Sequence, residues 1–225
     1  MHTKGLKNTG MINLDNNTIQ LDFFKRIIKI LHDCDYNMCR DILDSYSYTQ
    51  FESKVKVIEI ILNSGILNKK TNVTIFGCWF GSILAAALSN EVKSINGYDM
   101  NEEVIRIAKK LFIDYKNINF HKVDIFKKYK TEYSESNLII NTSCEHMPSI
   151  KEWPYWHKIK KNTYVLFQSH NLKDINGHIN CVQTMEEFIN QMPKFLKIIH
   201  SEIIEEKLRN PHGGKRFTLF GYKNE

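Results

Sequence analysis

Apolar positions follow a helical period over the first part of the chain. The residues that recur at steps of three and four are Ile19, Phe23, Ile27, Ile30 and Leu31. This spacing places them on one face of a helix, and similar patterns predict helices over residues 38–45 and 51–63. Gly65 is typical of a residue that ends a helix. We therefore predict a helical cap over residues 1–70, whose first ~15 polar residues we expect to be poorly ordered.

Beyond residue 70 the pattern changes to short β-branched and aromatic runs separated by helical segments. The strand candidates are residues 72–76, 94–98, 118–121, 137–141 and 163–169. The helical candidates are residues 82–88, 102–113 and 184–191, and the last of these opens with a Thr184/Glu187 capping box. Strands that alternate with helices predict an α/β fold, in which helices cover both faces of a parallel sheet.

The end of the chain breaks this alternation. Residues 195–205 and 215–222 are both strand-like, and the segment Asn210-Pro-His-Gly-Gly214 between them is rich in turn formers. We expect an antiparallel hairpin at the edge of the sheet. Because no internal repeat or low-complexity linker divides the chain, we predict a single domain over residues 1–225, with the cap attached to an α/β core over residues 71–225.

Composition narrows the class of protein. The five cysteines are scattered without a C-x-x-C pair, which disfavours a disulfide framework or a structural zinc site, and the sequence assigns no set of metal ligands. The chain contains no run of about 18 apolar residues, and its N-terminus lacks the apolar stretch of a secretory signal. We therefore expect a cytoplasmic protein with no membrane partner. The net charge of +6 arises from 31 basic and 25 interleaved acidic residues, so it permits a nucleic acid partner without requiring one.

A glycine-containing turn, Phe76-Gly-Cys-Trp-Phe-Gly81, follows the first strand candidate. Glycine at 77 and 81 lets the backbone turn sharply and approach a ligand with no Cβ in the way. Trp79 stands where the G-x-G-x-x-G phosphate fingerprint has its middle glycine, which disfavours a dinucleotide because a pyrophosphate requires close backbone approach. The turn remains compatible with a ligand that has no phosphate. The alternative is that the glycines are purely structural.

Acidic and amide side chains end the next three strand candidates. Asp99 lies 22 residues after Gly77, close to the spacing at which an acid accepts hydrogen bonds from both ribose hydroxyls. Alternatively, Asp99 caps the following helix, a role that Asn101 could fill instead. Asp124 could accept a hydrogen bond from an adenine amino group or could be an ordinary turn residue. Asn141 ends the fourth strand candidate.

In this order, the glycine turn, Asp99, Asp124 and Asn141 resemble motifs I to IV of the class I S-adenosylmethionine-dependent methyltransferases. The resemblance covers about residues 70–222 and implies a Rossmann-like, seven-stranded, mostly parallel sheet of order 3-2-1-4-5-7-6. It implies S-adenosylmethionine as the cofactor, with the binding residues Gly77, Cys78, Trp79, Gly81, Asp99, Met100, Asp124, Ile125 and Asn141. The family turn often reads E/D-x-G-x-G-x-G. Here Phe76 replaces the acid and Trp79 replaces the middle glycine, so the amino-acid end of the cofactor has no assigned partner in this turn.

A closer resemblance involves the segment after the fourth strand. Methyltransferase-like proteins of tailed phages combine a G-x-W-[YF]-G turn with N-T-S-x-E-H, and this chain has both. The Glu145-His146 step is also similar to one found in many small-molecule class I methyltransferases, which implies that Glu145 and His146 are catalytic. His146 could remove a proton from the acceptor, since histidine is a common general base. The alternative is that His146 packs beside the next helix.

Other side chains near the same sheet edge each have a functional and a structural interpretation. Cys144 could be a nucleophile only in activating surroundings. The segment Gln168-Ser-His-Asn171 and His178 could contribute to an acceptor site or be turn residues. Lys54 could meet a carboxylate, or it could belong to an ordinary helix surface. The aromatic cluster of residues 153–156 could line an acceptor pocket or pack in the core.

These observations predict a methyltransferase whose acceptor is a small molecule. The alternatives are a nucleic-acid or protein methyltransferase, another use of S-adenosylmethionine such as aminocarboxypropyl transfer, and a binding protein without catalysis. A nucleic-acid enzyme would need a basic face, which the interleaved charges do not clearly provide. The sequence leaves the oligomeric state and the identity of the acceptor open.

Overall fold

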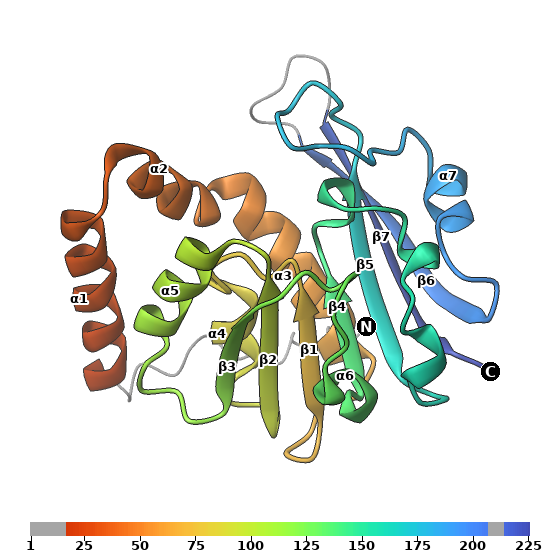
Figure 1. Ribbon diagram of the computed structural model, residues 1–225, viewed down its shortest axis with the longest axis horizontal. Coiled ribbons are helices and arrows are strands. Elements are labelled where there is room, and N and C mark those ends of the chain that lie inside the picture. The colour runs from red at the N-terminus through yellow and green to blue at the C-terminus, as the bar shows by residue number, and fades with distance from the viewer. Residues whose placement is uncertain (1–16, 207–213) are drawn as a thin grey trace, which may run out of the picture.

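A seven-stranded sheet runs through the structure, with helices on both of its faces (Figure 1). The computed structural model describes residues 17–206 and 214–225. The strands are β1 (Asn72–Phe76), β2 (Ser94–Asp99), β3 (Ile118–Lys122), β4 (Leu138–Asn141), β5 (Tyr164–His170), β6 (Leu196–Glu206) and β7 (Gly214–Lys223). Their order is β3-β2-β1-β4-β5-β7-β6, with β1 to β5 parallel and β7 antiparallel to both β5 and β6. This confirms the predicted fold class and strand order.

Alternate side chains along each strand divide the core between the two faces of the sheet. On β1, Ile75 packs in the cluster with α3 (Tyr48–Asn63), α4 (Leu84–Leu88) and α5 (Glu102–Leu111). The next residue, Phe76, packs in the opposite cluster with α6 (Thr131–Glu135) and α7 (Met185–Asn190). Strands that are buried on both faces require nearly continuous apolar runs. The first, fourth and fifth strand candidates have such runs.

The helical cap packs directly on this core. It consists of α1 (Asn17–Asp33), α2 (Tyr36–Ser45) and α3. Arg26 on α1 donates from Nε to the Leu111 carbonyl oxygen at 3.0 Å and pairs with Asp114. Ser53 on α3 donates to Oε1 of the buried Gln168 on β5 at 2.9 Å. These contacts attach the cap to the end of α5 and to β5. That residues 1–225 fold as one domain stays a prediction.

Element ends differ from the predicted ones by a few residues, for local reasons. Helix α2 starts before residue 38 because the Asp35 side chain caps it by accepting from the Met38 amide. The predicted capping at α7 is present, since Thr184 Oγ1 accepts from the Glu187 amide at 3.1 Å. The five-residue helix α6 was not predicted. The expected hairpin is confirmed, while its turn at residues 210–213 and the polar first ~15 residues lie outside the described residues. Within the described ranges, no helix is long and apolar enough to cross a membrane.

Replacing Gly81 with alanine should destabilise the fold more than the same change at Gly65. Both glycines have left-handed backbones, with φ of +66° and +70°, so an alanine costs about 1–2 kcal/mol at either position. At Gly81 a Cβ would also lie 2.8 Å from the buried Phe120 ring, whereas at Gly65 it would meet nothing within 4 Å. We expect a further loss of about 1–3 kcal/mol for Gly81→Ala, measured as the free energy of unfolding in urea. Equal losses at the two sites would contradict the contact.

Candidate functional site

The turn after β1 takes a left-handed backbone at three positions. Gly77, Trp79 and Gly81 have φ of 56°, 50° and 66°. Trp79 therefore adopts the conformation that a glycine would favour, at a cost in backbone strain. Two hydrogen bonds tie the turn to the end of β2: the Cys78 amide donates to the Tyr98 carbonyl at 3.0 Å, and the Trp79 amide donates to Asp99 Oδ2 at 3.1 Å. These two bonds fix the turn against the end of β2, although Trp79 and not glycine occupies the middle position.

Asp99 ends β2 beside this turn. Its Oδ1 accepts from the Asn101 amide at 3.0 Å, while the Asn101 side chain caps α5 by accepting from the amides of Glu103 and Val104. Asn101, rather than Asp99, is therefore the cap of this helix. Each Asp99 oxygen retains a lone pair beyond its one backbone bond. The next residue, Met100, is 71% exposed and offers an apolar surface beside the carboxylate.

Asp124 and Ile125 continue this row at the end of β3. The register places Asp99 opposite Lys122, and the Val123 amide donates to the Asp99 carbonyl at 2.8 Å. Asp124 Oδ1 accepts from the Phe126 amide at 3.0 Å, and its Oδ2 lies 3.4 Å from Lys127 Nζ. Ile125 is buried, and its carbonyl accepts from the Trp153 indole at 2.9 Å. The carboxyl ends of β1, β2 and β3 thus present the glycine turn and two carboxylates in one row.

Asn141 lies at the end of β4, opposite Phe76 in register, and its side chain is fully buried. Its Nδ2 donates to Met147 Sδ at 3.1 Å, and its Oδ1 accepts from the Ser143 amide at 3.0 Å. Ser143 in turn donates to the Gly77 carbonyl at 3.2 Å. Asn141 therefore connects the glycine turn with the segment that follows β4. Its direct contact with a cofactor stays a prediction.

Glu145 and His146 lie in the short helix η2 (Cys144–His146), directly after β4. Glu145 is 3% exposed, and its Oε2 has no hydrogen-bond partner among the described residues. The His146 side chain is 46% exposed, and its Nε2 lies 4.0 Å from Glu145 Oε1. His146 is therefore not a core residue, and its imidazole reaches the surface beside a buried carboxylate.

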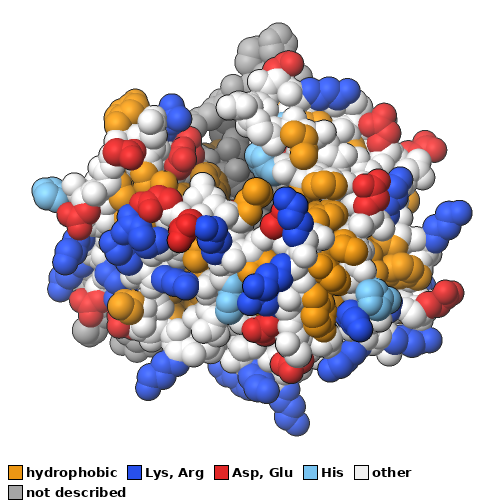
Figure 2. Space-filling view, viewed as in Figure 1, with side chains coloured by type: hydrophobic (Ala, Val, Ile, Leu, Met, Phe, Trp, Pro, Cys, Tyr) orange, Lys and Arg blue, Asp and Glu red, His pale blue; other side chains and the backbone are white. Residues whose placement is uncertain are grey.

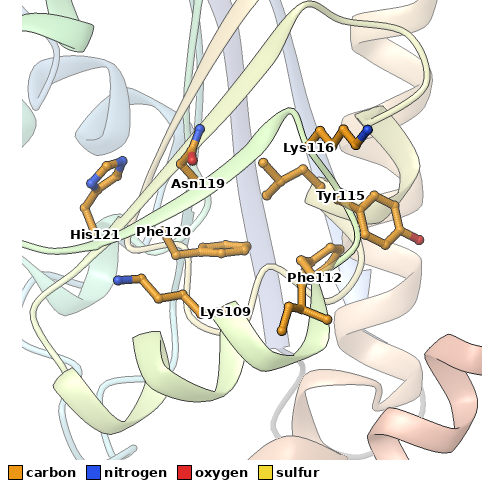
Figure 3. A pocket seen from close by; sticks show the side chains of 9 residues that line it. Lys109, Phe112, Tyr115, Lys116, Asn119, Phe120 and His121 are labelled. Carbon is orange, nitrogen blue, oxygen red and sulfur yellow. The ribbon is translucent and has the colours of Figure 1, made fainter.

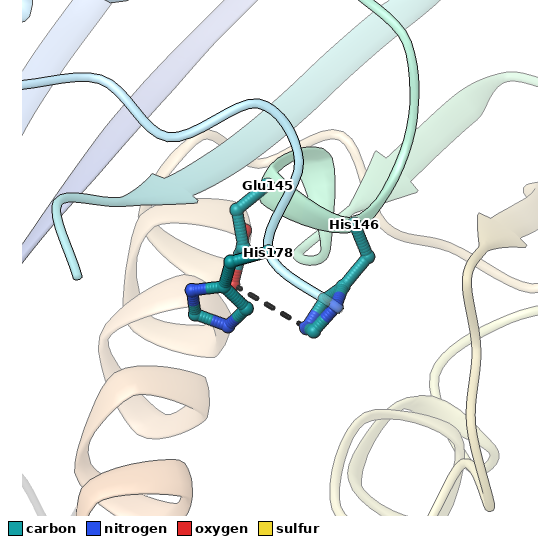
Figure 4. A group of neighbouring side chains, drawn as sticks. All are labelled: Glu145, His146 and His178. Atoms are coloured by element: carbon teal, nitrogen blue, oxygen red, sulfur yellow. Dashed lines mark ion pairs between the residues drawn. The ribbon is translucent and has the colours of Figure 1, made fainter. Parts of the chain in front are cut away.

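The loop after β5 adds His178 to this pair (Figure 4). The Glu145 carbonyl accepts from the amides of Ile179 and Asn180, at 2.8 and 3.0 Å, which fixes the loop against η2. The His146 and His178 rings consequently meet edge to face, with centroids 4.5 Å apart. The sequence identified His178 only as a polar candidate, because nothing in its spacing shows that the loop folds back onto η2.

Two basic residues face the buried end of Glu145. Arg216 Nη1 lies 3.8 Å from Glu145 Oε1, while Arg216 Nε donates to Glu206 at 2.6 Å. Burial alone would raise the pKa of Glu206, but the hydrogen bond from His170 and the Arg216 guanidinium outweigh it and lower that pKa to about 2. Burial, with Arg216 nearby, lowers the pKa of Lys54 to about 7. The charges of Glu145 and Glu206 oppose this lowering of the Lys54 pKa. Direct contact of Lys54 with a carboxylate stays a prediction.

Two other candidates belong to the core. Cys144 is buried, and desolvation together with the Glu145 charge raises the pKa of its thiol well above the usual value, which opposes a thiolate nucleophile. Trp153 and Trp156 are 2% and 5% exposed and pack against each other at 5.1 Å. The two tryptophans of the cluster therefore belong to the core, while Pro154 is exposed and Tyr155 is half-buried.

A separate hollow of about 450 Å³ lies at the outer edge of the sheet (Figure 3). Side chains of α5, of β3 and of the segment between them line it, among them Lys109, Phe112 and His121. None of the residues assigned to the cofactor lines this hollow. The candidate polar side chains converge instead at the carboxyl edge of β1 to β4, the edge at which open α/β sheets usually bind ligands.

Comparison with known proteins identifies relatives of the fold. No family model matches the sequence, and no curated protein matches it significantly. The N-methyltransferase NodS from Bradyrhizobium japonicum, solved in complex with S-adenosyl-L-homocysteine, superposes with a TM-score of 0.66 at 14% identity, covering 93% of this chain and all of NodS. A SAM-dependent methyltransferase from Methanosarcina mazei gives 0.56 at 15% identity, covering 72% and 97% of the two chains. A putative methyltransferase from Bacillus halodurans gives 0.59 at 9% identity, covering 74% and 98%. At these identities the likeness shows a shared fold.

Proposed function

We propose that the protein is an S-adenosylmethionine-dependent methyltransferase that acts on a small molecule. The observation that carries this proposal is the row formed by the glycine turn, Asp99 and Asp124 at adjoining strand ends. The fold agrees with it, because the structure of NodS, which shares the fold, contains S-adenosyl-L-homocysteine. The closer likeness to phage proteins stays a prediction that these comparisons do not support.

The residues of this row fit the chemistry of the cofactor. Asp99 would accept from the ribose hydroxyls, since its oxygens are held at the strand end and keep further lone pairs. The exposed side chain of Met100 would contact the adenine, and Asp124 with the Ile125 amide would meet its polar edge. Gly77, Cys78, Trp79 and Gly81 would face the part of the cofactor between ribose and sulfonium. The cofactor supplies the methyl group, and the protein supplies alignment and proton removal.

The acceptor would lie beside η2, where Glu145 and His146 follow β4. The Nδ1 atom of His146 lies 3.1 Å from the Gly177 carbonyl, so it carries the proton and leaves the Nε2 lone pair available as a base. Basic and acidic side chains are mixed over the face shown in Figure 2, which favours a small acceptor over a polyanion. A nucleic-acid or protein acceptor is the alternative.

The products released from the cofactor test this function. We expect the protein, incubated with methyl-labelled S-adenosylmethionine and a metabolite extract, to release S-adenosylhomocysteine and to label a small molecule. Asp99→Ala serves as the control, because it should bind the cofactor poorly. Label that appears in nucleic acid or protein would exclude the small-molecule acceptor. Methylthioadenosine would indicate aminocarboxypropyl transfer, and the absence of either product would indicate a binding protein.

A further inference from the structure

Three side chains with metal-binding atoms converge at the acceptor edge. One ligand atom each from Glu145, His146 and His178 lies within 4.8 Å of the others, and Figure 4 shows the three side chains turned toward one another. They come from η2 and from the loop after β5, so the fold rather than the sequence brings them together. Two imidazoles and a carboxylate form a donor set that first-row divalent metal ions favour.

Both imidazoles are held in the tautomer that a metal ligand needs. His146 Nδ1 lies 3.1 Å from the Gly177 carbonyl oxygen, and His178 Nδ1 lies 2.6 Å from the Leu172 carbonyl oxygen. A carbonyl accepts only from N–H, so each Nδ1 carries the proton and each Nε2 keeps its lone pair. Metal-binding histidines are typically oriented by such a bond from the second ring nitrogen.

The buried carboxylate supplies independent evidence for a cation. Glu145 Oε2 is buried and has no hydrogen-bond partner among the described residues, an arrangement that is costly when the oxygen stays unpaired. Arg216 does not satisfy it, because its Nη1 approaches the other oxygen, Oε1, at 3.8 Å and its Nε is bonded to Glu206. Lys54 also influences this carboxylate, but it has no hydrogen bond to it.

We propose that Glu145, His146 and His178 bind one divalent transition-metal ion. Three protein ligands leave coordination positions open, as in catalytic rather than structural metal sites. An oxygen of a small molecule would take such a position. If the proposed function holds, this oxygen belongs to the methyl acceptor, and the metal would hold it and lower its pKa. Metal binding itself does not depend on that function.

Cobalt(II) is the probe that tests the site, because its visible absorption reports the coordination of the bound ion. We expect the protein to bind one equivalent of Co²⁺ with a visible absorption band. His146→Ala and His178→Ala should each weaken this binding by ~10–100-fold or more, because the loss of a residue that only hydrogen-bonds to a metal ligand already has an effect of that size. His200→Ala is the matched control. His200 lies 3.7 Å from Glu202, yet no metal-binding cluster within the described ranges includes this pair, so its removal should leave the band unchanged.

The outcomes separate this site from the proposed function. Absence of stoichiometric Co²⁺ binding, or equal binding by the His146→Ala variant, would overturn the metal site. Glu145→Gln is a third variant. If this buried change prevents folding, the two histidine variants decide the question, because His146 is half-exposed. Calorimetry with S-adenosylmethionine on the same variants should show unchanged cofactor affinity. If the wild-type protein does not bind S-adenosylmethionine but does bind Co²⁺, the proposed function is contradicted and the metal site still stands.

Discussion

Asp99→Ala should weaken the binding of S-adenosylmethionine by about 1.5–3 kcal/mol, the contribution of a hydrogen bond to a charged group. This corresponds to roughly a 10- to 150-fold loss of affinity. The reason is that the Asp99 carboxylate is fixed at the end of β2 by the amides of Trp79 and Asn101 and keeps lone pairs for the ribose hydroxyls. Isothermal titration calorimetry measures the change directly.

A second carboxylate provides the control for this experiment. Asp114 is exposed and pairs with Arg26 at the end of α5, away from the proposed site, so Asp114→Ala should bind the cofactor like the wild type. Thermal unfolding of both variants separates affinity from folding, because Asp99 also holds the turn through the Trp79 amide. Equal affinity of Asp99→Ala and the wild type would remove Asp99 from the cofactor site. A lower melting temperature alone would then assign it a structural role.

Much of the fold could be predicted because the local hydrophobic patterns agree with the way helices pack on a parallel sheet. The apolar run of β1 and its turn glycines are sufficient to predict a buried strand that leads into a loop. The ends of successive parallel strands meet at one edge, which is why Asp99 and Asp124 could be assigned to one site before their positions were known. Helix α6 was not predicted, and the first residues of α2 and α3 were predicted less accurately. Their bounds depend on single caps such as Asp35 and on packing that local propensity does not contain.

The acceptor side was less predictable for a physical reason. Glu145 and His146 are adjacent in sequence, but whether their side chains face each other depends on the tight turn of η2. His178 reaches them only because the Glu145 carbonyl binds the backbone of the loop after β5. Arg216 and Lys54 approach from β7 and α3, so the charges around Glu145 come from distant parts of the chain. No single window of the sequence contains this arrangement.

His146→Ala should lower the rate of methyl transfer by ~10²–10⁴-fold, the usual contribution of a general base, with little change in cofactor affinity. The imidazole is 46% exposed beside the buried Glu145, so its removal should leave the fold intact. The comparison requires a known acceptor and is made on turnover at saturating cofactor. An unchanged rate would exclude His146 from the chemistry.

His178→Ala then distinguishes the two ways in which His146 could act. If His146 works alone as a base, His178 only packs against it with ring centroids 4.5 Å apart, and we expect its replacement to cost less than ~10-fold, well below the loss of a general base. If both imidazoles hold a metal ion, each variant loses a ligand, so the two should lose turnover to a similar extent. Activity that falls with a chelator and returns with added metal would support the second case. A strong loss in His146→Ala, with near-normal turnover in His178→Ala and no effect of chelation, would assign His146 as the base and leave the metal without a part in the reaction.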